Sequence, residues 1–173
     1  MPHLIVVPGT LVSQWEQELK VAFQPNYVDI LVYGAGLAQH EYFWSDTGPY
    51  KQAKHSASSR IILASHSVSV VTRLVRASNQ TYQALQQDYG LLYTPQKKPK
   101  DLPWAHPARS ISYNKNVHKT LFSQEYLSVV FDEAQTIRNC GPRQSSALLI
   151  LEQCSVRLIL TATPLQTSTK VRD

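Results

Sequence analysis

Five short and largely apolar runs recur along the chain, at residues 4–7, 28–33, 61–64, 127–131 and 156–160. Runs of this length that are rich in valine, isoleucine and leucine are typical of strands buried on both faces of a sheet. Each run is followed by glycine, by proline or by polar residues, which favour turns. The pattern therefore predicts five core strands.

A helix is expected after the first run, because apolar side chains recur at helical spacing from Leu11 to Ala22. Ser13, with Glu16 three residues later, fits a capping box, and Thr10 is an alternative cap. This combination predicts a first unit of strand, turn and helix.

Two further segments, 67–88 and 144–153, are compatible with helices. Strands that alternate with helices predict an α/β fold, a parallel sheet with flanking helices. Residues 89–116 break the pattern, because a glycine and four prolines interrupt them, with lysines in between. That segment is predicted to be a long surface loop or a disordered insertion.

Charge is distributed unevenly along the chain. Residues 51–119 hold 11 Lys and Arg against two acids, which gives +9, whereas the rest hold six basic and ten acidic residues, which gives −4. A basic middle suggests a polyanion partner such as DNA. A solvated, lysine-rich loop is the alternative interpretation.

Composition excludes some classes of protein. No run approaches the roughly 20 apolar residues of a membrane span, so no membrane partner is expected. The two cysteines, Cys140 and Cys154, have neither metal-binding nor redox spacing, and we expect free, buried thiols in a reducing compartment.

The acidic pair Asp132 and Glu133 directly follows the fourth apolar run. Ligands of open parallel sheets bind beyond the carboxyl ends of the strands. One carboxylate there can hold Mg²⁺, usually through water, while the ion bridges nucleotide phosphates. Its neighbour can orient and deprotonate the attacking water. Two solvated acids after a core strand are the alternative.

The fifth run leads into Thr161, Ala162, Thr163 and Pro164. The order Asp-Glu-Ala-Gln and then Leu-Thr-Ala-Thr-Pro resembles motifs II and III of the superfamily-2 helicases. An ordinary turn explains the threonines and the proline when the second motif is taken alone.

Residues 4–20 narrow the resemblance to the Swi/Snf-type ATPases. In motif Ia of that family an apolar strand ends in proline, and a helix carries a tryptophan followed by acids. The corresponding residues are Pro8, Trp15, Glu16 and Glu18. Thr-Ile-Arg-Asn after the acidic box and Leu-Gln after motif III resemble the same family, whereas residues 60–70 match motif Ib weakly. Trp15 itself is expected to pack in the core.

The resemblance implies an incomplete RecA-like helicase ATP-binding lobe over residues 1–173, with a basic loop insertion at 89–116. It implies ATP and Mg²⁺ as cofactors, with Asp132 as metal ligand, Glu133 as general base and Gln135 beside the nucleotide. Coupling between nucleotide and DNA falls to Thr161, Thr163 and Gln166. The expected DNA-binding residues are Pro8, Ser13, Lys97, Lys98, Lys100, Arg109 and Lys115.

Three departures from the family pattern stand out. Gln135 replaces the usual histidine and Ala162 the usual glycine, which bears on coupling more than on fold. No Gly-x-x-x-x-Gly-Lys-Ser/Thr loop occurs, because none of the six glycines precedes a lysine. That loop cradles phosphates through its backbone N–H groups. We therefore expect a fragment that begins after this loop, ends before the second ATPase lobe, and is inactive alone.

In the complete protein the resemblance implies ATP hydrolysis coupled to translocation on double-stranded DNA, in nuclear chromatin remodelling or DNA repair. Chromatin and nucleosomes are then possible partners. Two alternatives stay open: another superfamily-2 helicase, and a non-catalytic remnant that binds DNA or protein.

Overall fold

The computed structural model describes residues 1–24, 26–34, 36–67, 84–94, 107–137 and 141–162. Within them, five parallel strands form one sheet in the order β2-β3-β1-β4-β5. The strands are β1 (His3–Pro8), β2 (Asp29–Tyr33), β3 (Arg60–Ser67), β4 (Tyr126–Phe131) and β5 (Cys154–Ile159). Each overlaps a predicted run, so the α/β fold with a parallel sheet is confirmed.

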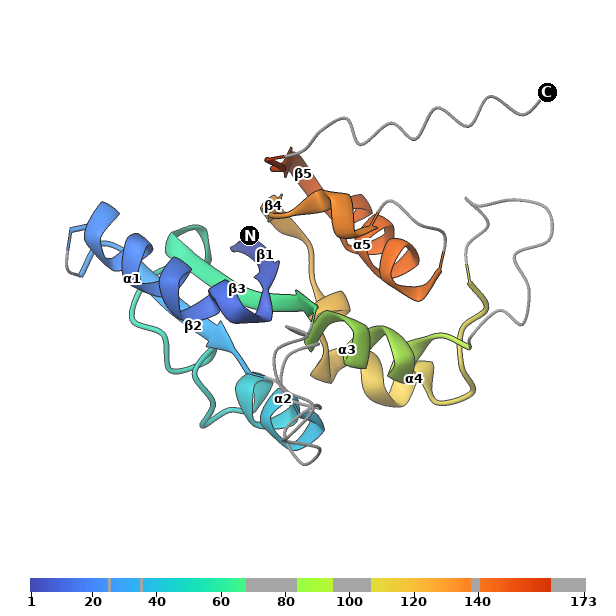
Figure 1. Ribbon diagram of the computed structural model, residues 1–173. Helices are drawn as coiled ribbons and strands as arrows, with labels where there is room; N and C mark the ends of the chain where they lie inside the picture. The colour runs from blue at the N-terminus through green and yellow to red at the C-terminus, as the bar shows by residue number, and fades with distance from the viewer. Residues whose placement is uncertain (25, 35, 68–83, 95–106, 138–140, 163–173) are drawn as a thin grey trace, which may run out of the picture.

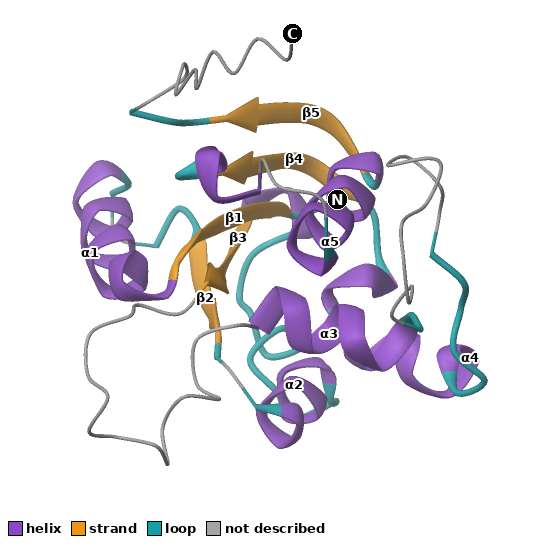
Figure 2. Cartoon of the chain, turned by 45° about the vertical axis from the view of Figure 1, so that its right-hand side comes forward, coloured by secondary structure: helices purple, strands orange, loops and turns teal. Residues whose placement is uncertain are grey.

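Helices cover both faces of the sheet. They are α1 (Val12–Ala22), α2 (Leu37–Trp44), α3 (Ala84–Leu92), α4 (Tyr113–Asn116) and α5 (Pro142–Glu152). Short 3₁₀ segments lie at Gly9–Leu11, Ala57–Ser59, Val117–Lys119, Leu121–Ser123 and Ala134–Ile137. Helix α1 lies on one face of the sheet, and α2, α3 and α5 lie on the other (Figures 1 and 2).

The central position of β1 follows from its composition. Leu4, Ile5, Val6 and Val7 are all buried, which requires cover on both faces and a neighbour along each edge. Leu4 and Val6 belong to the larger core cluster, beneath α3 and α5, and Ile5 and Val7 to a smaller cluster beneath α1. Strand β1 therefore lies between β3 and β4 and holds their carboxyl ends on its two sides.

The predicted cap of the first helix is wrong. Helix α1 has Leu11 at its N-cap position and no side-chain capping bond, so neither Ser13 nor Thr10 caps it. The 3₁₀ turn Gly9–Leu11 runs directly into α1, and its backbone replaces the polar cap. The first predicted unit of strand, turn and helix is otherwise confirmed.

The surface loop predicted from residue 89 is wrong at its start. Helix α3 extends to Leu92, and Tyr89, Leu92 and Tyr93 are buried in the core. Tyr93 also forms an isolated bridge with Arg109, which brings the chain back after the segment 95–106, outside the described residues. Of the helix predicted at 67–88, residue 67 belongs to β3 and only the end, from Ala84, is described as helical.

Helix α5 confirms the prediction at 144–153. Cys154 has a free thiol, as expected, but its side chain is only partly buried. Cys140 lies outside the described residues. Across the described part of the chain, no helix has the length and apolar character needed to cross a membrane.

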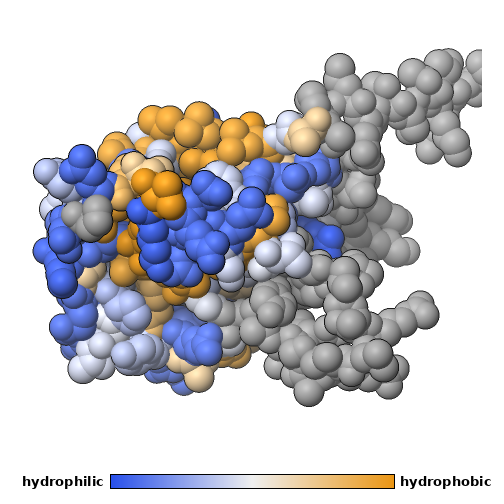
Figure 3. Space-filling view, turned by 60° about the vertical axis from the view of Figure 1, so that its left-hand side comes forward, coloured by the Kyte–Doolittle hydropathy of each residue, from blue (hydrophilic) through white to orange (hydrophobic). Residues whose placement is uncertain are grey.

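Strand β5 is exposed although it is apolar. It pairs only with β4, so its other edge is free in the sheet described here. Val156 and Leu158 lie opposite Ser128 and Val130, and they remain 49% and 48% exposed. Figure 3 shows hydrophobic side chains gathered at the top of the molecule, at the height of β5 in Figure 1. The described part of the chain therefore exposes apolar side chains along its edge strand.

Replacing Val156 and Leu158 together by threonine is expected to raise the solubility of the chain. Threonine keeps the β-propensity of the strand while removing an exposed apolar patch. The measurement is the soluble fraction in a precipitant series, with Leu148→Gln on α5, 42% exposed, as a single-site control. If both variants raised the soluble fraction equally, the gain would not be specific to the exposed edge strand.

Candidate functional site

The carboxyl ends of β4 and β5 bring the two predicted motifs together. The amide of Ala134 donates to the carbonyl of Leu160 at 3.0 Å, and the amide of Leu160 donates to the carbonyl of Phe131 at 2.8 Å. The segment after β4 therefore turns back across the end of β5. This places the segment that carries the acidic pair beside Thr161.

Asp132 is held at all of its polar groups. The indole Nε1 of Trp15 donates to Oδ2 at 3.0 Å, and the amide of Glu133 donates to Oδ1 at 2.8 Å. The backbone amide of Asp132 donates to the carbonyl of Val6, and its carbonyl accepts from Nε2 of His66 at 2.9 Å. Helix α1 and strands β1 and β3 thus hold this half-buried residue in place after the carboxyl end of β4.

Sequence reasoning missed His66. The side chain is 3% exposed, and its ring stacks on Phe131 with 4.7 Å between ring centroids. Burial, the largest cause, lowers the pKa of His66, so the ring is neutral at physiological pH and Nε2–H donates to the Asp132 carbonyl. The available signal was a histidine at the carboxyl end of an apolar run, where ligand sites of parallel sheets lie.

Glu133 adopts a left-handed backbone conformation, with φ of 51°. For a residue other than glycine this costs about 1–2 kcal/mol, and such residues persist where neighbouring contacts hold them. Its side chain is held by Gln135, whose Nε2 donates to Oε2 of Glu133. Because of this backbone conformation, the side chain of Glu133 points in a different direction from the one it would take in an extended strand.

Gln135 connects the two strand ends. Its Oε1 accepts a hydrogen bond of 2.6 Å from the hydroxyl of Thr161, while its Nε2 donates to Glu133. An amide offers one acceptor and one donor group on a flat frame, so it can bridge the hydroxyl and the carboxylate at the same time. Gln135 therefore links the segment after β5 to the acidic pair after β4.

A cavity of about 300 Å³ opens beside Asp132. Its lining residues are Leu11, Gln14, Trp15, Glu18 and Asp132. The volume equals that of about ten water molecules in the liquid. Two carboxylates in one open cavity favour a cation.

The donor set fits Mg²⁺. Carboxylate oxygens are the ligands that this hard cation prefers, and it keeps several of its waters in protein sites. Each Asp132 oxygen accepts one N–H bond and so keeps acceptor capacity for a metal-bound water. Among the described residues, no group of three or more His, Cys, Asp or Glu side chains could hold a metal ion, so a Mg²⁺ ion at Asp132 would be bound mainly through water.

The expected DNA-binding residues do not lie together. Pro8 ends β1 and Ser13 is exposed on α1, whereas Lys115 lies on α4 at the opposite side of the molecule (Figures 1 and 2). Arg109 is exposed, and its guanidinium lies 4.3 Å from the centroid of the Tyr113 ring. The remaining DNA-binding candidates, Lys97, Lys98 and Lys100, lie outside the described residues, and so do the coupling candidates Thr163 and Gln166.

Part of the basic charge is structural. The Arg60 guanidinium donates to the carbonyls of Tyr50, Ala53 and His55. Lys119 forms a 2.5 Å ion pair with Glu41. These two cations are less available to a polyanion than exposed residues such as Lys115.

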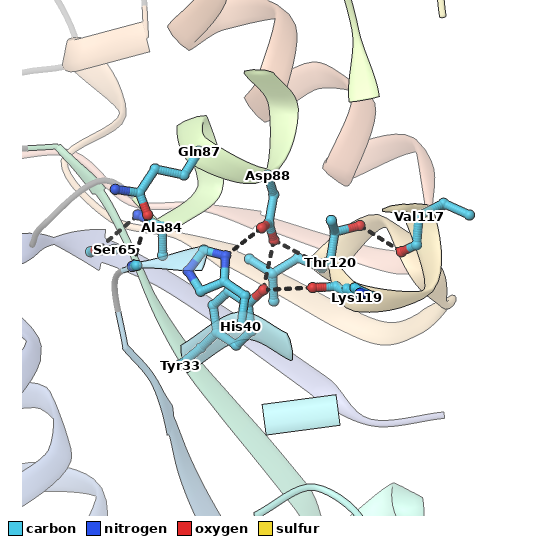
Figure 4. Close-up of polar contacts among 11 residues, drawn as sticks. Tyr33, His40, Ser65, Ala84, Gln87, Asp88, Val117, Lys119 and Thr120 are labelled. Atoms are coloured by element: carbon cyan, nitrogen blue, oxygen red, sulfur yellow. Dashed lines mark hydrogen bonds and ion pairs between the residues drawn. The ribbon is translucent and has the colours of Figure 1, made fainter. Parts of the chain in front are cut away.

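A second polar cluster lies in the core, formed by Tyr33, His40 and Asp88 (Figure 4). Asp88 is fully buried and accepts from His40 Nδ1 at 2.6 Å and from the Tyr33 hydroxyl at 2.9 Å. The amide of Leu121 donates to the same carboxylate at 2.8 Å. The cluster joins β2, α2, α3 and the turn before β4, and it was not predicted.

A five-stranded parallel sheet with an acidic pair at the carboxyl end of a central strand is the architecture of a RecA-like lobe. The chain matches the family model described as SNF2-related domain over residues 1–171 of its 173, and it belongs to this family of ATPase domains. No curated protein matches the chain.

Proposed function

We propose that the chain supplies the acidic half of the ATP site in the first lobe of a Swi/Snf-type DNA translocase. Asp132 holds Mg²⁺, and Glu133 is the general base. The observation that carries this proposal is the hydrogen-bonded chain from Thr161 through Gln135 to Glu133, which joins the ends of two neighbouring strands. Solvated acids after a core strand would not need such a chain.

Each residue has a separate task in hydrolysis. Gln135 fixes one oxygen of Glu133, so that the other can orient a water and accept its proton. Asp132 is oriented by Trp15 and by the amide of Glu133. Bound Mg²⁺–ATP supplies the reactive phosphorus and the cation that offsets phosphate charge. Thr161, with Thr163 and Gln166 beyond it, transmits the state of the acidic box toward DNA.

The sheet supports completion of the lobe by a further strand and helix. The free edge of β5 offers unpaired backbone groups, and the face beside α1 exposes Val156 and Leu158. A strand on this edge that leads into β1 by a right-handed crossover would place its helix on the face that α1 only partly covers. We propose that this unit brings the phosphate-binding loop.

The proposal extends to partners and location by family alone. The substrate is double-stranded DNA, bare or in chromatin. One side of the chain contacts it through Pro8 and Ser13, and the other side contacts it through the basic segment, residues 51–119. A second ATPase lobe closes over the nucleotide. A protein with these partners in a eukaryotic cell works in the nucleus.

The chain alone is expected to show no ATP turnover, with or without duplex DNA. Its sequence lacks the phosphate-binding loop, whose lysine would contact the β- and γ-phosphates. The assay is phosphate release by the purified chain. DNA-stimulated turnover that Glu133→Gln abolishes would contradict the prediction of inactivity.

The function itself is tested by reading the genomic DNA on both sides of the coding sequence and assaying the longest polypeptide it encodes. DNA-stimulated turnover that falls about 100-fold or more in Glu133→Gln supports the proposal. If no phosphate-binding loop is encoded, or if turnover is unaffected by this substitution, the non-catalytic remnant becomes the better interpretation.

A further inference from the structure

The indole of Trp15 does more than fill space. The ring packs against the apolar cluster beneath α1, as expected from the sequence, and this packing would be equally met by phenylalanine. Its Nε1–H, however, lies 3.0 Å from Oδ2 of Asp132, a residue 117 positions away in the sequence. An indole N–H can only donate, and a carboxylate oxygen accepts, so the bond has one direction.

The bond completes the orientation of the Asp132 carboxylate. An aspartate side chain has two rotatable angles, and a single hydrogen bond leaves the carboxylate plane free to turn. Here Oδ1 accepts from the amide of Glu133 and Oδ2 from Trp15, so both oxygens are held by donors from different elements. With the backbone carbonyl also bound by His66, the carboxylate keeps one direction into the adjoining cavity.

We propose that Trp15 is a positioning residue for Asp132, and that its N–H sets the carboxylate orientation required to hold a divalent cation. The inference rests on the proposed function, because it takes Asp132 as the metal-binding carboxylate. Groups that orient a metal ligand through a hydrogen bond affect metal affinity about 10- to 100-fold, although they never contact the ion. Trp15 would also link α1, with the exposed Ser13, to the acidic box.

The experiment uses nuclear magnetic resonance on the full chain with Mn²⁺ alone as the probe. Mn²⁺ broadens signals of nearby protons, so weak binding is measurable. The amide of Glu133 reports the Asp132 carboxylate, because the two are hydrogen-bonded. In Trp15→Phe, about 10-fold more Mn²⁺ is expected to be required for the same broadening of this amide.

Trp44→Phe is the matched control. Trp44 packs among Tyr33, Phe43 and Tyr50, on the other side of the sheet. This variant is expected to keep the parent Mn²⁺ dependence. A Trp15→Phe protein with the parent dependence overturns the positioning role alone. An absence of selective broadening at Glu133 in the parent overturns the metal role of Asp132, and the proposed function with it.

A second measurement does not depend on metal or on the folding of Trp15→Phe. In Asp132→Asn the charged acceptor is lost, so the indole N–H signal of Trp15 is expected to move upfield, while that of Trp44 stays in place. An unmoved Trp15 signal would show that the bond is not formed in solution, and it would overturn the proposal.

Discussion

Asp88→Ala is expected to lower the free energy of unfolding by about 3–5 kcal/mol, because each buried donor that loses its acceptor costs about 1–3 kcal/mol. Asp88 is fully buried on α3, where it accepts from His40, Tyr33 and the amide of Leu121 (Figure 4). Its removal leaves His40 Nδ1 and the amide of Leu121 without an acceptor, and it leaves the Tyr33 hydroxyl with only a long contact of 3.4 Å to the carbonyl of Lys119. Each buried donor that loses its acceptor keeps the cost of its lost hydration.

The physical chemistry of this cluster makes the effect large. Burial, the largest cause, raises the pKa of Asp88, against the three donors that favour the charged form. Burial likewise raises the pKa of Tyr33, whose hydroxyl therefore remains a donor. The carboxylate is tolerated in the core only because these donors replace water. The cluster also connects residues 33 to 121, so its loss loosens four elements together.

The measurement is urea unfolding followed by tryptophan fluorescence and circular dichroism. The control is Glu41→Ala, which removes a carboxylate from an exposed ion pair with Lys119 and is expected to leave stability unchanged within error. An Asp88→Ala protein within about 1 kcal/mol of the parent would show that the cluster does not hold the core together.

The second large effect is expected in DNA binding. If the basic segment neutralises about three to five phosphates, the logarithm of affinity falls with the logarithm of salt at a slope on the order of −3 to −5. A fourfold rise in salt would then weaken binding by about 60- to 1,000-fold. Such binding should not depend on base sequence, because phosphate contacts carry none of that information.

Two pairs of substitutions with the same charge change locate the contact. Arg109→Ala with Lys115→Ala removes two exposed cations of the basic segment, and about 1.8 units of slope if both contact phosphates. Lys20→Ala with Arg143→Ala removes two exposed cations elsewhere and should change the slope little. The measurement is fluorescence anisotropy with random duplexes across a salt series.

A five-residue variant replaces Lys97, Lys98 and Lys100 by alanine, in addition to Arg109 and Lys115. Unchanged affinity and slope in the five-residue variant would mean that the basic segment is solvated and does not bind DNA. The two residues on the other side of the molecule, Pro8 and Ser13, would then be the remaining candidates.

The strands and their order along the chain could be predicted because each strand is a local apolar run bounded by turn residues. Helix α2 was missed for the opposite reason. It lies between Gly36 and Ser45, has no clear apolar stripe in sequence, and buries His40 as well as Phe43. A buried histidine is polar in a local pattern, and its carboxylate partner lies 48 residues away.

The acidic box could be predicted from order and spacing, but its supports could not. Trp15 fitted a core position, and nothing within one helix indicates a bond to a residue 117 positions later. The same holds for His66, which lies 66 residues from the carbonyl it binds. The predicted cap at Ser13 is wrong because a 3₁₀ turn leads directly into α1, and the helix begins without a side-chain cap.

The central position of β1 has a consequence for how the chain acquires its structure. Strand β1 pairs on one edge with β3 and on the other with β4, whose Ser128 is made 125 residues after His3. At synthesis rates of about 5–20 residues per second, that second partner follows roughly 6–25 s later. Helix α1 and strand β3 can pack on β1 during this interval, because both precede β4 in the chain. The edge of β1 that receives β4 stays unpaired until then, so the strand that carries the acidic box is the one that completes the sheet around β1.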